Sequence, residues 1–230
     1  MKKYYIIVLL FLSSLGFTGC ELLGLDFQEP YDYDDQIGTY DNQLKMTAWQ
    51  FMKSRTDIFS SLLSAIEYAE IDSAIFNKPD QTLLLVTNKG LTSSTAADLS
   101  YWYNHQIENG DGTTTMPLSW DVYPKDQVRQ LVLYHIVKGA WSYMEISNAT
   151  QGATTFFSTN SSLSEGYVAL QIKREGAMSI YFNNFASHYK VDLKARTNNL
   201  QVPNGTYIHV MDNYLNYPTD LDMTLYPIYK

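Results

Sequence analysis

ARTNNLQVPNGTYIHVMDNYL, Ala195–Leu215, is the part of this 230-residue chain from which the fold follows most directly. Within it, Pro203-Asn204-Gly205 signals a tight turn, because proline fixes one backbone angle while Asn and Gly tolerate left-handed conformations. The next residues, Thr206–Asp212, are apolar on both faces apart from His209, which is typical of a strand inside a sheet. We therefore predict a turn that leads into a buried strand.

Further strands and helices are predicted upstream of this turn from the spacing of apolar residues. The predicted strands are Thr82–Thr87, Ala153–Ser158, Tyr167–Lys173, Met178–Asn183 and Tyr189–Ala195. The predicted helices are a segment that starts near Leu44, an amphipathic segment capped by Thr56-Asp57 that runs to Ala69, a short turn over Ile71–Phe76, and Asp126–Val137, which ends before Gly139. Helices first and strands later indicate an α+β fold, in which an antiparallel sandwich carries helices.

Three segments in this order resemble the fasciclin-like FAS1 domain family. They are TLLLVTNKGL (Thr82–Leu91), LVLYHIVKGAW (Leu131–Trp141) and the stretch Ala195–Leu215 quoted above. The resemblance covers residues 44–217 and implies a wedge-shaped β-sandwich with N-terminal helices packed on it. It also implies adhesion or extracellular binding and no catalysis. Asn199-Leu200 stands where some animal members carry the Asp-Ile pair linked to receptor adhesion, so that activity is not transferred.

Five residues match the family segments and can be interpreted as binding residues or as structural ones. They are Tyr134, His135, Asn204, Gly205 and His209. By resemblance, His135 could contact a partner. Read from the residues alone, it is a buried imidazole that bonds backbone at a helix end, and His209 packs within a sheet. We favour the structural reading for both histidines.

The first twenty residues are predicted to direct export and lipid attachment. Lys2 and Lys3 precede an apolar run that is too short to span a bilayer, so residues 1–19 read as a signal peptide. Cys20 follows Gly19, an arrangement that resembles a bacterial lipobox, in which the cysteine is acylated and becomes the mature N-terminus. Glu21, not Asp, follows the cysteine, so by analogy the outer membrane is favoured over inner-membrane retention.

Charge is distributed unevenly along the mature chain. Residues 21–41 hold seven acids and no Lys or Arg, whereas the remainder has 17 acids against 14 bases. We therefore predict an acidic tether over residues 20–43, and its alternative role is a signal for export to the cell surface. The cell surface is favoured over the periplasmic face. An acidic chain without a basic cluster is not a nucleic-acid binder.

No pattern of catalytic or cofactor-binding residues is present in the sequence. The four histidines are isolated, the single cysteine is assigned to lipid, and no Gly-x-Ser-x-Gly or glycine-rich phosphate loop occurs. We therefore predict no catalytic residue, no metal site, no cofactor other than the covalent lipid on Cys20, and no enzyme activity.

The best candidate for ligand binding is an aromatic segment, Asp98–Lys125. Its rings are Tyr101, Trp102, Tyr103, Trp120 and Tyr123. Exposed rings beside amides and hydroxyls suit a sugar or a protein partner, whereas the alternative is that these rings cover the core. A tail, residues 218–230, either packs on its own sandwich, adds a strand or docks on a partner.

These observations predict a lipid-anchored, non-catalytic binding or adhesion module of the outer membrane. By resemblance to FAS1 lipoproteins of Bacteroidota, its partner would be a protein complex for nutrient uptake, containing an outer-membrane transporter and a lipoprotein. The alternative is a cell-surface protein that binds glycans through the aromatic segment.

Overall fold

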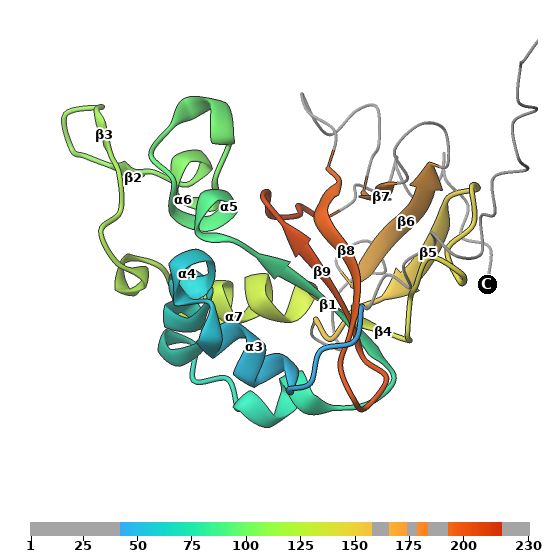
Figure 1. The fold of residues 1–230 in the computed structure, drawn as a ribbon. Helices are drawn as coiled ribbons and strands as arrows, with labels where there is room; N and C mark the ends of the chain where they lie inside the picture. The colour runs from blue at the N-terminus through green and yellow to red at the C-terminus, as the bar shows by residue number, and fades with distance from the viewer. Residues whose placement is uncertain (1–41, 158–165, 174–178, 184–192, 218–230) are drawn as a thin grey trace, which may run out of the picture. The chain divides into compact units, whose positions relative to one another are not determined.

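The computed structural model describes residues 42–157, 166–173, 179–183 and 193–217 (Figure 1). These residues belong to the second of two units into which the chain divides, Asn42–Lys230. Its helices are α3 (Ala48–Ser54), α4 (Thr56–Tyr68), α5 (Asn88–Thr92), α6 (Tyr101–Asn104) and α7 (Lys125–Tyr134), with short 3₁₀ helices η1 (Ser73–Asn77), η2 (Ala96–Asp98) and η3 (Trp120–Val122). Its strands are β1 (Gln81–Val86), β2 (Ile107–Glu108), β3 (Thr114–Thr115), β4 (Ile136–Lys138), β5 (Gln151–Thr154), β6 (Tyr167–Lys173), β7 (Ser179–Phe182), β8 (Ala195–Gln201) and β9 (Tyr207–Met211).

The first two helices begin differently from each other. Thr47 starts α3 with a reciprocal cap, since its hydroxyl accepts from the Gln50 amide at 3.2 Å and the Gln50 side chain accepts from Thr47 N–H at 3.0 Å. The prediction that Thr56-Asp57 caps α4 is wrong: the helix already includes Thr56, and Asp57 lies in its first turn. There the carboxylate pairs with Arg55 at 2.9 Å and complements the helix dipole.

Two sheets form the β part of the fold. One has the strand order β4-β1-β9-β8 and the other the order β5-β6-β7, and single bridges join them at Val137–Thr155 and Tyr181–Lys194. The expectation of a purely antiparallel sandwich is wrong for one pair, because β1 and β9 run parallel. All six residues of β1 are buried, as the apolar run Leu83–Val86 predicts for its centre, and the polar residues Gln81 and Thr82 are buried as well.

Other boundaries differ from the prediction where tertiary contacts intervene. The helix predicted over Asp126–Val137 ends at Tyr134, since Ile136–Lys138 pairs with β1 as strand β4. The predicted strand Tyr189–Ala195 falls mainly outside the described residues. The following residues form β8, which was not predicted because Asn198 and Asn199 interrupt its apolar pattern.

One hydrophobic core connects helices and sheets. Buried side chains of α3, α4, α7 and both sheets belong to a single cluster, and the helices gather at one side of the four-stranded sheet (Figure 1). The α+β class predicted from the sequence is therefore confirmed. Within the described residues, no helix is both long enough and apolar enough to cross a membrane.

Candidate functional site

The rings of the aromatic segment point mainly into the protein. Tyr101, Trp120 and Tyr123 are buried, and Tyr101 lies 5.9 Å from Trp120 and 5.6 Å from Tyr123 between ring centres. The Trp120 indole donates to the Ser61 carbonyl at 3.1 Å. The expectation that these three rings form an exposed binding surface is therefore wrong, and the alternative, that they cover the core, is correct for them.

Local structure explains this inward orientation. The Ser100 hydroxyl caps the one-turn helix α6 by accepting from the Tyr103 amide at 3.1 Å, and this turn directs Tyr101 inward. Trp102 and Tyr103 are half-buried. The Trp102 indole packs edge to face on Trp120 at 5.4 Å, and its N–H has no hydrogen-bond partner among the described residues.

A pocket of about 160 Å³ opens beside this aromatic cluster, between α6, α7 and the segment that follows β9. Its lining residues are Tyr101, His105, Gln127, Gln130, Leu131, Tyr214, Leu215, Asn216 and Tyr217. None of them is an acid, a lysine or an arginine. The pocket therefore offers aromatic rings, amides and one imidazole, which suit an uncharged or weakly polar group.

Ring contacts and hydrogen bonds fix the wall of this pocket. The His105 ring stacks on Tyr101 at 4.1 Å, and Tyr214 meets Tyr101 edge to face at 5.2 Å. Gln127 donates to the Tyr101 hydroxyl at 2.6 Å. Burial raises the pKa of both tyrosine hydroxyls, so these groups stay protonated and neutral.

Sequence reasoning found only one of these lining residues, Tyr101. Gln127 and Gln130 are polar positions three apart on α7, next to its buried face, and that placement was the available signal. His105 and Tyr214 carried none, because these two rings, which meet edge to face at 6.1 Å, are 109 residues apart along the chain.

Tyr134 and His135 lie in the core beside the pocket. His135 accepts the Leu215 N–H on Nε2 at 2.9 Å, so its proton is assigned to Nδ1, which donates to the Leu131 carbonyl at 2.8 Å. Burial lowers the pKa of His135 to about 4. Both ring nitrogens are thus engaged with backbone, which is the structural role that the sequence favoured.

The Tyr134 hydroxyl belongs to a buried polar network. It donates to the Tyr167 carbonyl and accepts from the Asn183 amide at 2.6 Å. Asn183 also donates to the Asn216 carbonyl at 2.9 Å and accepts from the Ala169 N–H at 2.8 Å. This network ties α7 to the three-stranded sheet and to the segment lining the pocket.

The remaining family-type residues are structural as well. His209 accepts from the Asn199 N–H at 3.1 Å and donates to the Trp141 carbonyl at 2.9 Å, and burial lowers its pKa to about 4. Asn204 donates to the Asn77 carbonyl at 2.8 Å, and Gly205 has a φ of 87°, which a turn of this kind requires.

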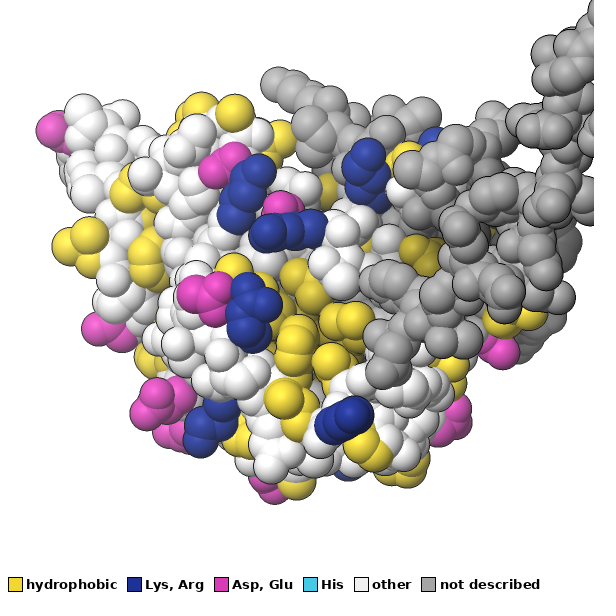
Figure 2. All heavy atoms as spheres, in the orientation of Figure 1, with side chains coloured by type: hydrophobic (Ala, Val, Ile, Leu, Met, Phe, Trp, Pro, Cys, Tyr) yellow, Lys and Arg dark blue, Asp and Glu magenta, His cyan; other side chains and the backbone are white. Residues whose placement is uncertain are grey.

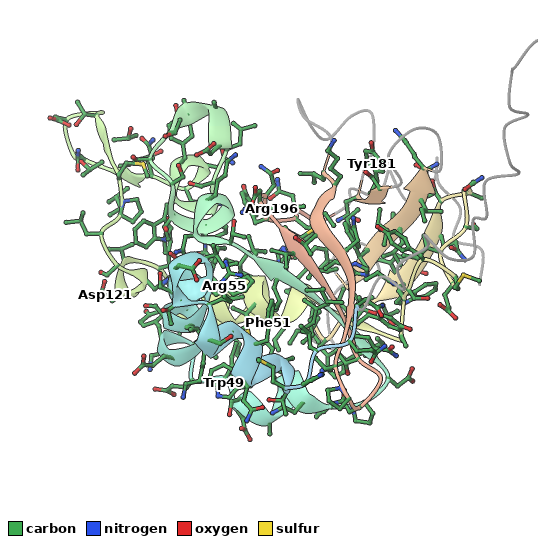
Figure 3. The ribbon with its side chains drawn as sticks, in the orientation of Figure 1. Trp49, Phe51, Arg55, Asp121, Tyr181 and Arg196 are labelled. Carbon is green, nitrogen blue, oxygen red and sulfur yellow. The ribbon has the colours of Figure 1, made fainter. Side chains whose placement is uncertain are left out.

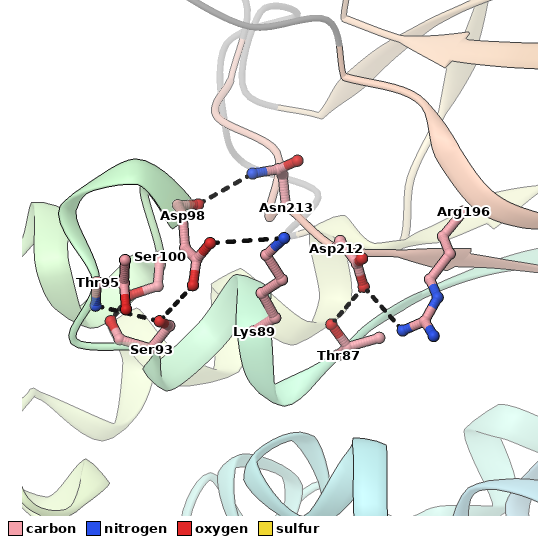
Figure 4. A network of polar contacts seen from close by, with 9 residues as sticks. All are labelled: Thr87, Lys89, Ser93, Thr95, Asp98, Ser100, Arg196, Asp212 and Asn213. Atoms are coloured by element: carbon pink, nitrogen blue, oxygen red, sulfur yellow. Dashed lines mark hydrogen bonds and ion pairs between the residues drawn. The ribbon is translucent and has the colours of Figure 1, made fainter.

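A network of charged and polar side chains connects α5 to the end of β9 (Figure 4). Asp212 accepts from the Thr87 hydroxyl at 2.9 Å and faces Arg196 at 3.5 Å, while Asp98 accepts from the Ser93 hydroxyl and faces Lys89 at 3.5 Å. Each acid in this network is matched by a base and a hydroxyl. We therefore assign the network a structural role, in which it holds α5 against the end of β9.

Among the described residues, no group of three His, Cys, Asp or Glu side chains could hold a metal ion. The lipid-anchor candidate, Cys20, lies outside the described residues, and so do the signal peptide, the tether to Asp41 and the tail from Pro218. The domain ranges predicted there stay predictions.

Comparisons with known proteins describe the fold only. No family model matches the chain, and no curated protein matches it. Among solved structures, it is similar to a FAS1 domain pair from the insect cell adhesion molecule fasciclin I, with 16% identity and a TM-score of 0.40. The match covers 71% of this chain and 49% of that chain, so this chain spans about half the length of the structure it matches.

That structure belongs to the family that the sequence segments resemble. The elements of this chain define an α+β protein whose candidate site is a neutral, aromatic and amide-lined pocket. Cell adhesion is a description of the matched insect protein. A similarity at this level carries no argument about what this chain binds.

Proposed function

We propose that this chain is a non-catalytic binding module of the bacterial envelope, anchored in the outer membrane through lipid on Cys20 and accessory to a complex for adhesion or nutrient uptake. The observation that supports binding is the pocket between α6, α7 and the segment after β9. Its rings are held in place by mutual packing, and none of its lining groups is an activated nucleophile or a carboxylate. The anchor rests on the sequence of residues 1–20.

The pocket favours one side chain of a protein partner as its occupant. A volume of about 160 Å³ accommodates a single large apolar or aromatic side chain. Tyr217 and Leu131 would contact its apolar body, while the amide of half-buried Gln130 forms no hydrogen bond with other described residues and could pair with partner backbone. Buried aromatic anchors of this type dominate the energy of many protein interfaces.

The test fills the pocket without changing charge. Gln130→Trp places a ring at the pocket, and Ser64→Trp adds the same ring to an exposed position of α4 as a control. Each variant is used to pull down its partners from solubilised outer membranes. We expect the wild type and Ser64→Trp to recover a transporter or an envelope lipoprotein, and Gln130→Trp to recover at least tenfold less of it. Recovery of the protein alone from wild-type cells would contradict the partner proposal.

Location needs a separate experiment. Cells carrying the wild type or Cys20→Ala are labelled with a radioactive fatty acid and then treated with protease while intact. We expect label on the wild type only, and surface cleavage if the domain faces outward. A labelled protein that resists protease would place the domain on the periplasmic face and exclude a role in contact between cells.

Glycan binding is the second candidate, and one observation favours it. A single sugar ring is of the size of this pocket, and amides beside aromatic rings are suitable sugar contacts. The burial of Trp120 removes the exposed tryptophan surface on which the hypothesis first rested. A glycan array tests whether the pocket binds glycans. Glycan binding that is lost in Gln130→Trp and retained in Ser64→Trp would support this candidate, and a wild type that binds no glycan would reject it.

A further inference from the structure

Most of the exposed large hydrophobic side chains lie on two segments whose residues do not line the pocket. Five large hydrophobic residues are exposed among those described, and three of them, Ile107, Leu118 and Val122, lie on residues 106–122, here called the arm. Leu118 is 93% exposed. A fourth, Met46, precedes α3, within residues 42–55, here called the basic segment. Exposed hydrophobic side chains that form a contiguous patch mark an interaction site.

The arm is acidic. Its exposed acids are Glu108, Asp111 and Asp121, and the sequence contains no Lys or Arg between Lys89 and Lys125. None of these three acids forms an ion pair with another described residue. In Figure 2 the part of the surface formed by the β2–β3 hairpin, labelled in Figure 1, shows hydrophobic and acidic side chains and no basic ones.

The arm is also held in a fixed shape. Trp120 anchors it to α4 through Ser61, and the Tyr123 hydroxyl donates to the His105 carbonyl at 2.6 Å at its base. At the hairpin, Asn109 donates from its side chain to the hydroxyls of Thr113 and Thr115 at 2.8 and 2.9 Å. A surface that is already ordered loses little conformational entropy when it binds.

The basic segment has the opposite charge. Residues 42–55 contain three bases and no acid. Asp57 neutralises Arg55, whereas Lys45 and Lys53 are exposed and form no ion pair with described residues. Trp49 and Phe51 are partly exposed and lie on α3, the helix that also contains Lys53 (Figure 3), and Figure 2 shows hydrophobic side chains bordered by basic ones on the face that it draws.

We propose that the arm of one copy of this protein docks on the basic segment of a second copy. Leu118 contacts the apolar side chains beside α3, while Glu108 and Asp121 face Lys45 and Lys53. Because the two contacting surfaces differ, the contact is heterologous, and anchoring copies in one membrane would raise their effective concentration.

A charge-swap experiment tests this proposal in sedimentation velocity runs. The protein is the chain from residue 20 with Cys20→Ser, which removes the lipid. One variant carries Glu108→Lys and Asp121→Lys, a second carries Lys45→Glu and Lys53→Glu, and a third carries all four changes. We expect the wild type to self-associate with concentration, each double variant alone to associate at least tenfold more weakly, and their mixture and the fourfold variant to associate again.

Two further measurements separate this contact from other causes of association. Leu118→Asp should weaken self-association at least tenfold, whereas Met144→Asp, at an 86% exposed position elsewhere, and Gln130→Trp in the pocket should not change it. Raising salt from about 0.1 to about 1 M, which shortens the screening length from about 10 to about 3 Å, should weaken association of the wild type. A monomer at every concentration, association unaffected by Leu118→Asp, or no recovery in the mixture overturns the proposal. Failure of pocket binding alone would leave it intact.

Discussion

Acid is expected to destabilise this domain through its two buried histidines. In His135 and His209, one ring nitrogen accepts a backbone N–H and the other donates to a backbone carbonyl, so the folded protein holds the neutral ring. Burial lowers the pKa of each from 6.5 to about 4. As pH falls from 6.5 toward 4, the unfolded chain therefore binds protons that the folded chain does not, and the free energy of unfolding decreases.

The size of the effect follows from the lowered pKa. Each tenfold difference in proton affinity corresponds to about 1.4 kcal/mol, so each histidine lowers the free energy of unfolding by about 2–3 kcal/mol between about pH 7.5 and about pH 4.5. Since domains of this size are stable by only about 5–15 kcal/mol, the pair removes a large share of the total. Exposed acids such as Glu70, whose pKa is lowered by Lys125, add to the loss only at still lower pH.

Urea unfolding of the wild type and His209→Gln across this pH range measures the contribution. At neutral pH the variant should be less stable by about 1–3 kcal/mol, because it loses buried hydrogen bonds. On acidification, its free energy of unfolding should then fall by about 2–3 kcal/mol less than that of the wild type. Tyr134→Phe is the control, since it removes a buried hydroxyl that does not titrate in this range and should lower stability equally at each pH. Parallel curves for wild type and His209→Gln would refute the reasoning.

Three further predictions concern residues whose roles the structure distinguishes. Trp120→Ala should cost about 3–5 kcal/mol in urea unfolding, because it empties a buried site, whereas Leu118→Ala should change stability by less than about 0.5 kcal/mol. Gly90→Ala should cost about 1–3 kcal/mol, since a Cβ there would lie 2.7 Å from a Val86 methyl and 2.9 Å from the Asp212 carbonyl oxygen. In cell fractionation, Cys20→Ala should move the protein from the membrane to the soluble fraction. Equal stability of the Trp120 and Leu118 variants, a neutral Gly90→Ala, or membrane retention without Cys20 would contradict each in turn.

Local patterns predicted much of the fold because burial leaves a direct trace in sequence. The apolar runs in β1 and β6 placed both strands within one residue. The end of α7 was misplaced because Ile136 and Val137 fit a helix face as well as a strand. What ends the helix is pairing with β1 and the bond between the His135 ring and the Leu131 carbonyl, and neither is visible in a single segment.

Pairing between distant segments could not be predicted from the sequence. The parallel neighbours β1 and β9 place Leu84 opposite His209, at a separation of 125 residues. The pocket depends on the same kind of contact, because Tyr214 reaches Tyr101 only after β9 has paired with β1. Residues that line a site assembled from both ends of a chain have no common sequence signal.

The aromatic segment shows why a cluster of aromatic residues in a sequence is a weak indicator of a binding site. Rings attract attention as binding residues, but large apolar side chains in a segment that must fold against a helix lower the free energy most when they are buried. Trp120 and Tyr123 therefore point inward, and the positions left outside carry small, polar or acidic side chains together with Ile107, Leu118 and Val122. The inward rings fix the shape of the arm, and the outward residues decide what it can contact. In this segment, binding specificity is thus expected from Glu108, Leu118 and Asp121, and stability from the tryptophans.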